Sequence, residues 1–197
     1  MTTSFSNTPY LSDNHPQEIA VKALLAEKMV LLATDTVWSL TGMLHSQEAV
    51  ECVQRISRKD LTPEFLFASV DQLKEYVPRL HPRLETLLLV HQRPLTLLVE
   101  GYRNIPEYAH QGRQQIAVRV VRDAYLKDLI EEVDAPLFTT PAYTAEGAIA
   151  GHFGQVSSDI LTKIDFVDKH RQMETEMGTL SVMAMMGEKG ELDFLRS

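Results

Sequence analysis

The sequence LLATDTVWSL, residues 31–40, decides how this chain is organised. A short apolar run, typical of a buried strand, ends on Thr34, Asp35 and Thr36 rather than on Gly, Asn or Pro. In an extended segment the two hydroxyls point to one face and the carboxylate to the other. Ligands of α/β sheets gather beyond the carboxyl ends of strands, so the stretch predicts either a binding loop or, more commonly for such hydroxyls, a turn cap.

Helical and strand patterns alternate on both sides of this stretch. Strands are predicted at residues 30–34, 65–70, 95–100, 116–121 and 135–140, with a hairpin of two more over 179–197. Helices are predicted at 16–29, 46–57, 71–77, 82–90, 123–133 and 157–164. Consecutive strands without a helix between them indicate a mixed sheet. We therefore expect one α/β (α+β) domain, residues 16–197, with a mixed twisted sheet of about seven strands flanked by helices, and a flexible arm at 1–15.

Composition narrows the functional class. The chain has 197 residues, 44% of them hydrophobic, and a net charge of -8, which argues against a generally basic nucleic-acid binder but leaves a local basic groove open. The single cysteine, Cys52, fits a reducing compartment. No signal peptide is recognisable, and no apolar run approaches the ~18 residues of a membrane span, so we expect a cytoplasmic protein without a membrane partner.

Common catalytic motifs are missing from the sequence. It contains no G-x-G-x-x-G after a strand, no Walker-type G-x-x-x-x-G-K and no H-E-x-x-H, and its seven histidines lack ligand spacing, so no metal site is expected. Arg119 stands out because it lies inside the apolar strand IAVRV. A buried guanidinium needs a carboxylate, a phosphate or a solvent-filled cleft, so Arg119 either binds a ligand or pairs internally, for instance with Asp35.

The order of several segments carries a family resemblance. ATDTVWSL (33–40) resembles the Pro-Thr-Asp-Thr-Val-Tyr-Gly-Leu signature of the YrdC family, the threonylcarbamoyl-AMP synthases and their YciO- and YwlC-like relatives. EAVECVQRI (48–56), RPLTLLV (93–99), IAVRV (116–120), APLFTTPAYTAEG (135–147) and GTLSV (178–182) resemble later family segments in the same order. The resemblance runs from about residue 17 to 196, and the consistent order makes it specific.

The resemblance implies a YrdC-like domain with a large concave cleft. Family enzymes are nucleotidyltransferases that join L-threonine, bicarbonate and ATP, with Mg²⁺, into threonylcarbamoyl-AMP, which then modifies an adenosine in tRNA. Some relatives carry a double-stranded-RNA-binding description. For this chain the resemblance implies that Thr34 and Thr36 help to form the amino-acid end of the cleft and that Arg119 holds the threonine carboxylate.

The sequence departs from the family where the triphosphate should bind. The family uses a Lys-x-Arg pair after the second helix, but here RISRKD (55–60) places Ser57 and Lys59 in those slots or, shifted by one residue, Arg58 and Asp60. An anion attacks an anion in this reaction, so fixed cations are needed, and loss of one such donor typically lowers the rate ~10²–10³-fold.

A second departure lies in the Ser-Ala-Asn segment of the family. TPAY (140–143) places Pro141 in the serine slot and Tyr143 in the asparagine slot, which removes a hydroxyl, a backbone N–H and an amide. The candidate nucleotide- or RNA-binding residues are therefore Arg58, Lys59, Thr140, Tyr143 and Thr179. For the two cations, solvated surface charge is the alternative.

Three functions remain open from sequence. The first is a divergent YrdC-like protein that binds an L-threonine-like small molecule, a nucleotide or a structured, double-stranded RNA, with a degraded adenylation site. The second is an active L-threonylcarbamoyladenylate synthase that uses ATP and Mg²⁺, and the third is a scaffold subunit. RNA binding would require the basic residues to cluster, and those considered are Arg55, Arg58, Lys59, Arg79, Arg83 and Arg93.

Overall fold

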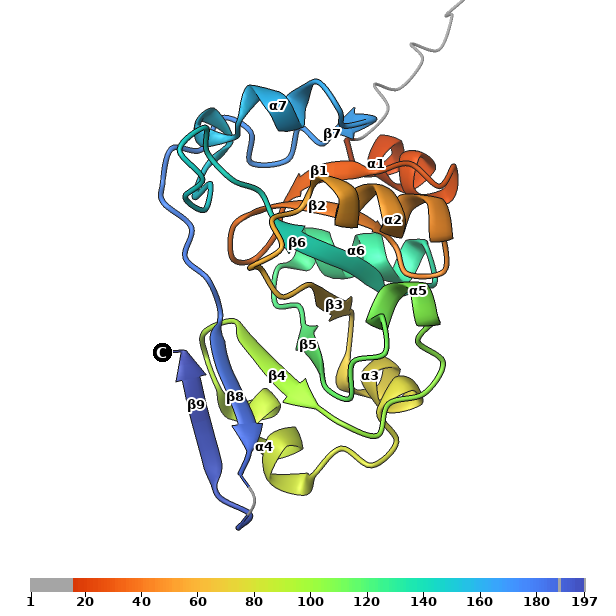
Figure 1. The fold of residues 1–197 in the computed structure, drawn as a ribbon, viewed down its shortest axis with the longest axis vertical. Coiled ribbons are helices and arrows are strands. Elements are labelled where there is room, and N and C mark those ends of the chain that lie inside the picture. Colours follow the sequence, from red (N-terminus) through yellow and green to blue (C-terminus); the bar gives the residue numbers. More distant parts are fainter. Residues whose placement is uncertain (1–15, 188, 197) are drawn as a thin grey trace, which may run out of the picture.

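The computed structural model describes residues 16–187 and 189–196. The predicted arm at 1–15 lies outside the described residues. One mixed sheet crosses the molecule in the strand order β7-β1-β2-β6-β3-β5-β4-β8-β9 (Figure 1). Its strands are β1 (Val30–Ala33), β2 (Trp38–Met43), β3 (Glu64–Phe67), β4 (Leu95–Val99), β5 (Ile116–Val120), β6 (Leu137–Pro141), β7 (Phe166–Val167), β8 (Val182–Met186) and β9 (Leu192–Arg196).

Helices cover both faces of this sheet. They are α1 (Pro16–Leu25), α2 (Gln47–Ile56), α3 (Val70–Tyr76), α4 (Pro82–Val90), α5 (Glu107–His110), α6 (Ala124–Glu132) and α7 (Ser158–Leu161), with a 3₁₀ turn at Phe153–Gln155. One core cluster packs α1 and α6 against β1, β3 and β6, and the other packs α2, α3, α4 and α5 on the opposite face. None of the described helices has the length and apolar character that crossing a bilayer would require.

The sheet has nine strands rather than the expected seven. The two additional strands are β2, which pairs with β1 as a hairpin, and β7, which adds two residues parallel to β1. The mixed α/β architecture and the C-terminal β8–β9 hairpin are confirmed. β2 was not predicted because Thr41 and Gly42 interrupt its pattern of alternating apolar residues. Within the sheet, the Thr41 hydroxyl lies 3.1 Å from that of Thr139 on β6.

Two of the predicted helices begin at residues that cap them. Ser46 Oγ accepts from the Ala49 amide at 3.2 Å, and Asp123 Oδ1 accepts from the Leu126 amide at 2.9 Å. The first and last predicted helices are shorter than expected: α1 ends at Leu25 rather than at residue 29, and α7 ends at Leu161 rather than at residue 164.

Candidate functional site

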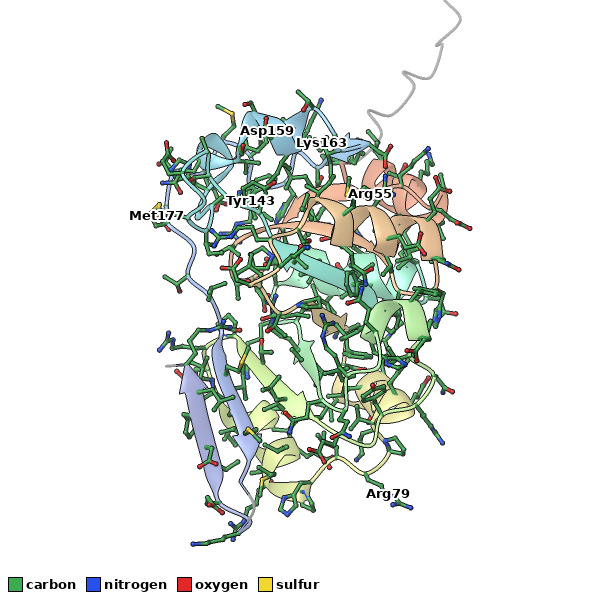
Figure 2. The ribbon with its side chains drawn as sticks, viewed as in Figure 1. Arg55, Arg79, Tyr143, Asp159, Lys163 and Met177 are labelled. Carbon is green, nitrogen blue, oxygen red and sulfur yellow. The ribbon has the colours of Figure 1, made fainter. Side chains whose placement is uncertain are left out.

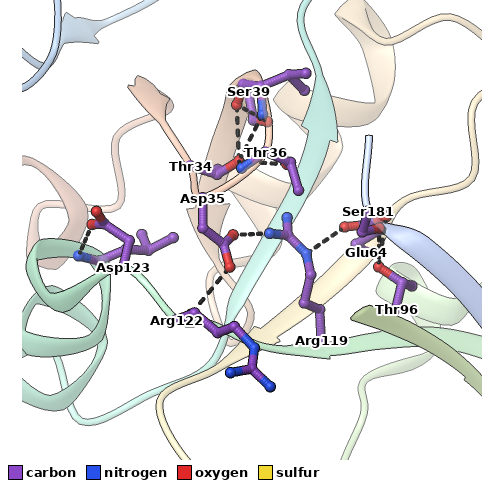
Figure 3. Close-up of polar contacts among 12 residues, drawn as sticks. Thr34, Asp35, Thr36, Ser39, Glu64, Thr96, Arg119, Arg122, Asp123 and Ser181 are labelled. Atoms are coloured by element: carbon purple, nitrogen blue, oxygen red, sulfur yellow. Dashed lines mark hydrogen bonds and ion pairs between the residues drawn. The ribbon is translucent and has the colours of Figure 1, made fainter. Parts of the chain in front are cut away.

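Thr34 and Thr36 lie in the tight loop between β1 and β2. Thr34 Oγ1 donates to the Val37 carbonyl at 2.8 Å and lies 2.8 Å from Thr36 Oγ1 (Figure 3). Because the hydroxyl proton of Thr34 goes to the Val37 carbonyl, the Thr36 hydroxyl must donate to Thr34 Oγ1. The backbone amides of Thr36 and Val37 also donate to Thr34 Oγ1. The threonines therefore cap a hairpin turn, which is the commoner of the two roles that the sequence allowed.

Arg119 lies between two carboxylates. Its Nε donates to Glu64 Oε2 at 3.0 Å, and its Nη1 donates to Asp35 Oδ1 (Figure 3). The Arg122 amide donates to the other Asp35 oxygen at 3.1 Å, which fixes the loop carboxylate in place. The Arg119 side chain is 1% exposed. This is the internal ion pair that the sequence left open as an alternative to ligand binding, with Glu64 as a second partner.

The electrostatics of this triad are set by burial. Burial lowers the pKa of Arg119 to about 9, which still lies above neutral pH, so the guanidinium stays charged. Burial also raises the pKa of Glu64, and this rise is opposed first by the charge of Arg196 and then by the Thr96 hydroxyl, which donates to Glu64 Oε1 at 3.1 Å. Arg119 is thus compensated within the protein before any substrate carboxylate arrives.

The hollow beside Thr34 and Thr36 has a volume of about 10 Å³, about the size of one water. Residues 171–178, which we call the covering segment, close it. Arg171 Nη1 donates to the Thr34 carbonyl at 3.0 Å, and the Gly178 amide donates to the Gly151 carbonyl at 2.9 Å. An amino acid could bind next to these threonines only if the covering segment moved.

Gly178→Ala tests how tightly the covering segment is seated. A Cβ at this position would overlap the Thr36 carbonyl oxygen, so we expect a loss of about 1–3 kcal/mol in unfolding free energy, measured by urea denaturation. Gly154→Ala is the control, because its Cβ would meet only the imidazole of His152, at 3.3 Å. Equal stability of the two variants would contradict the close contact.

A separate hollow of about 340 Å³, here called the cationic pocket, lies beyond the C-terminal end of α2. Three of its lining side chains are cations, Arg58, Lys59 and Arg113, and none is a carboxylate. The hydroxyls of Ser57 and Thr140 lie 2.5 Å apart at its wall. The remaining lining residues are Gln54, Leu61, Pro63, Gln111 and Phe138.

Arg58 is held in place by a carboxylate outside the lining. It donates to Asp60 at 2.9 and 2.5 Å, and this hydrogen-bonded pair lowers the pKa of the Asp60 carboxyl and raises that of Arg58. A Cβ on Gly147, which has a φ of +84°, would lie 3.0 Å from Arg58 Nη1. The loop that follows β6 therefore packs directly on this guanidinium.

Tyr143 lies next to the pocket but does not line it. Its hydroxyl donates to the Ile56 carbonyl at 3.2 Å, and its backbone bridges to Ile149, so it ties the loop after β6 to the end of α2 (Figure 2). Thr179 is exposed on the segment before β8 and lines neither hollow. The structure therefore brings Arg58, Lys59 and Thr140 together, with Tyr143 adjacent, and leaves Thr179 apart.

Arg113 was not among the residues expected from sequence. Gln111 and Gly112 both adopt positive φ, 53° and 71°, in the turn after α5, and this turn presents Arg113 to the pocket. The glycine in HQGRQ was a detectable turn signal. The spatial proximity of this loop to α2, however, depends on contacts between distant segments, such as Gln54 Nε2 donating to the Tyr108 carbonyl at 2.8 Å.

The basic residues considered for RNA do not form one patch. Arg55 lies on α2 and Arg79 lies near the opposite end of the molecule, below α3 (Figure 2). Arg79 instead lines the largest hollow described, of about 550 Å³, between the α3–α4 connection and strands β4 and β8. Among the described residues no group of three or more His, Cys, Asp or Glu side chains could hold a metal ion.

Comparison with known proteins places this geometry in context. The Sua5/YciO/YrdC family model, described as telomere recombination, matches residues 22–197. A curated threonylcarbamoyl-AMP synthase from Pseudoalteromonas atlantica is 26% identical over 168 residues, which cover 82% of this chain and 81% of that protein. One from Marinobacter nauticus is 26% identical over 151 residues, covering 75% and 80%.

Solved structures share the fold. A double variant of P. abyssi Sua5 superposes with a TM-score of 0.78 at 23% identity, covering 91% of this chain and 55% of Sua5. P. abyssi Sua5 complexed with L-threonine gives 0.74 at 22% identity, covering 91% and 53%. E. coli YciO gives 0.76 at 13% identity, covering 92% and 88%. The chain thus spans about half the length of the Sua5 proteins that it matches and most of YciO.

Proposed function

The chain belongs to the Sua5/YciO/YrdC family, and from this premise we propose that it binds a small phosphate-bearing ligand of the nucleotide class in its cationic pocket, as a divergent member that does not join L-threonine to it. One observation carries the proposal. Arg58, Lys59 and Arg113 converge on a pocket whose lining contains no carboxylate, whereas the hollow beside Thr34 and Thr36 is closed.

The pocket chemistry suits a nucleotide. Arginine presents a planar fork that matches phosphate oxygens, and lysine adds a mobile point charge. The volume of about 340 Å³ lies in the usual range of ligand pockets, roughly 300–1,000 Å³. Of the three apolar lining residues, Leu61 is partly exposed and is the one that a flat base could contact, whereas Phe138 and Pro63 are buried. Since no carboxylate lines the pocket, the phosphates of the ligand would themselves have to hold any Mg²⁺ that accompanies ATP.

The residues expected to bind L-threonine support the proposal that this chain does not transfer threonine. The hydroxyls of Thr34 and Thr36 bind each other, and Arg119 is paired with Asp35 and Glu64. The cationic pocket and the threonine hollow also share no lining residue, so the structure does not join the two positions in one cavity. Adenylation requires the carboxylate-like nucleophile to reach the α-phosphate in line, and this arrangement separates them.

An active synthase is the second candidate. It is favoured by the two curated relatives named threonylcarbamoyl-AMP synthase and by the structural neighbour complexed with L-threonine. For this chain it would require the covering segment to lift and Arg58, Lys59 or Arg113 to replace the family cations. RNA binding has weaker support because Arg55 and Arg79 lie far apart (Figure 2).

Pyrophosphate release separates these candidates. Purified protein with ATP, Mg²⁺, L-threonine and bicarbonate is expected to release pyrophosphate no faster than the reaction without protein, because the threonine hollow is closed and family donors are replaced in both RISRKD and TPAY. An active synthase assayed in parallel is the positive control. Threonine-dependent release above background would overturn the proposal in favour of the synthase.

A further inference from the structure

Large apolar side chains gather on the surface at the β9 edge of the sheet. Phe194 and Leu195 on β9 and Leu89 and Val90 on α4 are all more than half exposed. Val90, Leu87 and Pro82 of α4 line a nearly apolar groove together with Leu192 of β9. Apolar surface concentrated in this way is typical of an interaction site.

β9 is also the last strand of the sheet. It pairs with β8 on one side, and no described strand pairs with its other side (Figure 1). An edge strand presents backbone N–H and C=O groups to a further strand, and exposed apolar side chains increase that tendency. Edge strands are commonly protected by charges or bulges, so the charges on β9 decide which partner it can accept.

The charges of β9 complement a second copy of β9. The ladder sets Asp193 opposite Met185 and Arg196 opposite Met183, and the bulge between Met183 and Ala184 therefore leaves Asp193 and Arg196 on the same face of the sheet. In an antiparallel pair centred between Phe194 and Leu195, Asp193 of each copy lies opposite Arg196 of the other. Within its own copy Arg196 donates to the Ser181 carbonyl at 2.7 Å and lies 3.6 Å from Glu64 Oε1, and because its side chain remains 33% exposed, its guanidinium can also meet a carboxylate of a second copy.

The apolar side chains fit the same arrangement. Phe194 lies opposite Ala184, and Leu192 lies opposite Met186, so both are on the face that α4 covers. A twofold axis perpendicular to the sheet keeps each face on its own side, which brings the two Phe194 rings and the two α4 helices to one surface. The two Phe194 rings would lie between the two α4 helices, next to the groove that Val90 lines in each copy.

We propose that two copies of this chain associate through antiparallel pairing of their β9 strands, with Phe194 packed between the two α4 helices and Asp193 paired with Arg196 of the other copy. The resulting interface is self-complementary, as a twofold dimer requires. No residue of β9 or α4 lines the cationic pocket, so the interface does not depend on the ligand proposed for that pocket.

Sedimentation equilibrium tests the proposal. The wild-type protein is expected at twice its 22.3 kDa chain mass, and Phe194→Glu is expected to raise the dimer dissociation constant at least about thirtyfold, because it buries a charge at the centre of the interface. Leu25→Glu on α1 is the matched control, since Leu25 is 55% exposed and Phe194 53%. A monomeric wild type, or a Phe194→Glu variant that dimerises as tightly as the control, would overturn the proposal.

A cysteine pair tests the register. In a Cys52→Ala background, Leu195→Cys is expected to form an intermolecular disulfide under mild oxidation, because the antiparallel pair places residue 195 beside the twofold axis. Met173→Cys in the same background, on the covering segment, is the exposed control. Equal cross-linking at both positions would show random collision and would exclude β9 pairing as the contact.

Discussion

An Arg119→Ala variant is expected to lose about 3–5 kcal/mol of unfolding free energy, enough to leave much of the protein unfolded at 37 °C. The cause is the removal of one charge from a buried triad, which leaves Asp35 without its cation and Glu64 with only Arg196, 3.6 Å away. Both carboxylate side chains are less than one tenth exposed, so water cannot replace the guanidinium. Urea denaturation followed by circular dichroism measures the loss.

Arg79→Ala is the control for this prediction. Arg79 is exposed, and substitutions of this kind usually change stability by no more than about 0.5 kcal/mol. Retained stability in Arg119→Ala, together with a thermal shift by L-threonine that the wild type shows and the variant lacks, would contradict the structural role. It would restore Arg119 to the carboxylate-binding role that the resemblance implied.

A Lys59→Ala/Arg113→Ala variant is expected to bind ATP or ADP at least about 100-fold more weakly than the wild type. Each substitution removes a charged donor from the lining of the cationic pocket, and hydrogen bonds to charged groups contribute about 1.5–3 kcal/mol each. Both residues are exposed and lie outside the core, so the fold should persist. Isothermal titration calorimetry at fixed ionic strength measures the two dissociation constants.

An Arg55→Ala/Lys163→Ala variant controls for net charge. This variant also loses two positive charges, but it loses them from α2 and from the segment after α7, outside the pocket lining (Figure 2). Its affinity for nucleotide should stay within about threefold of the wild type, because exposed charges at a distance are screened by salt. Equal weakening in both variants would show a general charge effect and would count against a defined phosphate site.

Local sequence signals predicted much of this fold. Seven of the nine strands, the capped starts of α2 and α6 and the C-terminal hairpin follow from apolar periodicity, capping residues and turn residues. These features depend on interactions within a few residues. β7 could not be predicted in this way, because a pair of residues, Phe166 and Val167, forms a strand only through its pairing with β1.

The candidate site was less accessible from sequence, because it depends on long-range proximity. Asp35 was foreseen as a partner of Arg119, but Glu64 reaches the same guanidinium from β3, which pairs with β5. Arg113 joins Arg58 only because the turn after α5 packs near the end of α2. Neither relation leaves a local pattern in the chain, whereas the Thr34 cap, which is local, was among the roles that the sequence allowed.

A crystal structure of the protein with bound ADP would locate the ligand phosphates directly. We predict that they lie within hydrogen-bonding distance of Lys59 and Arg113 in the cationic pocket, with the covering segment still closed over Thr34 and Thr36. Phosphates bound instead between Pro141 and Arg119, next to an opened threonine hollow, would contradict the proposed function and identify a working synthase site.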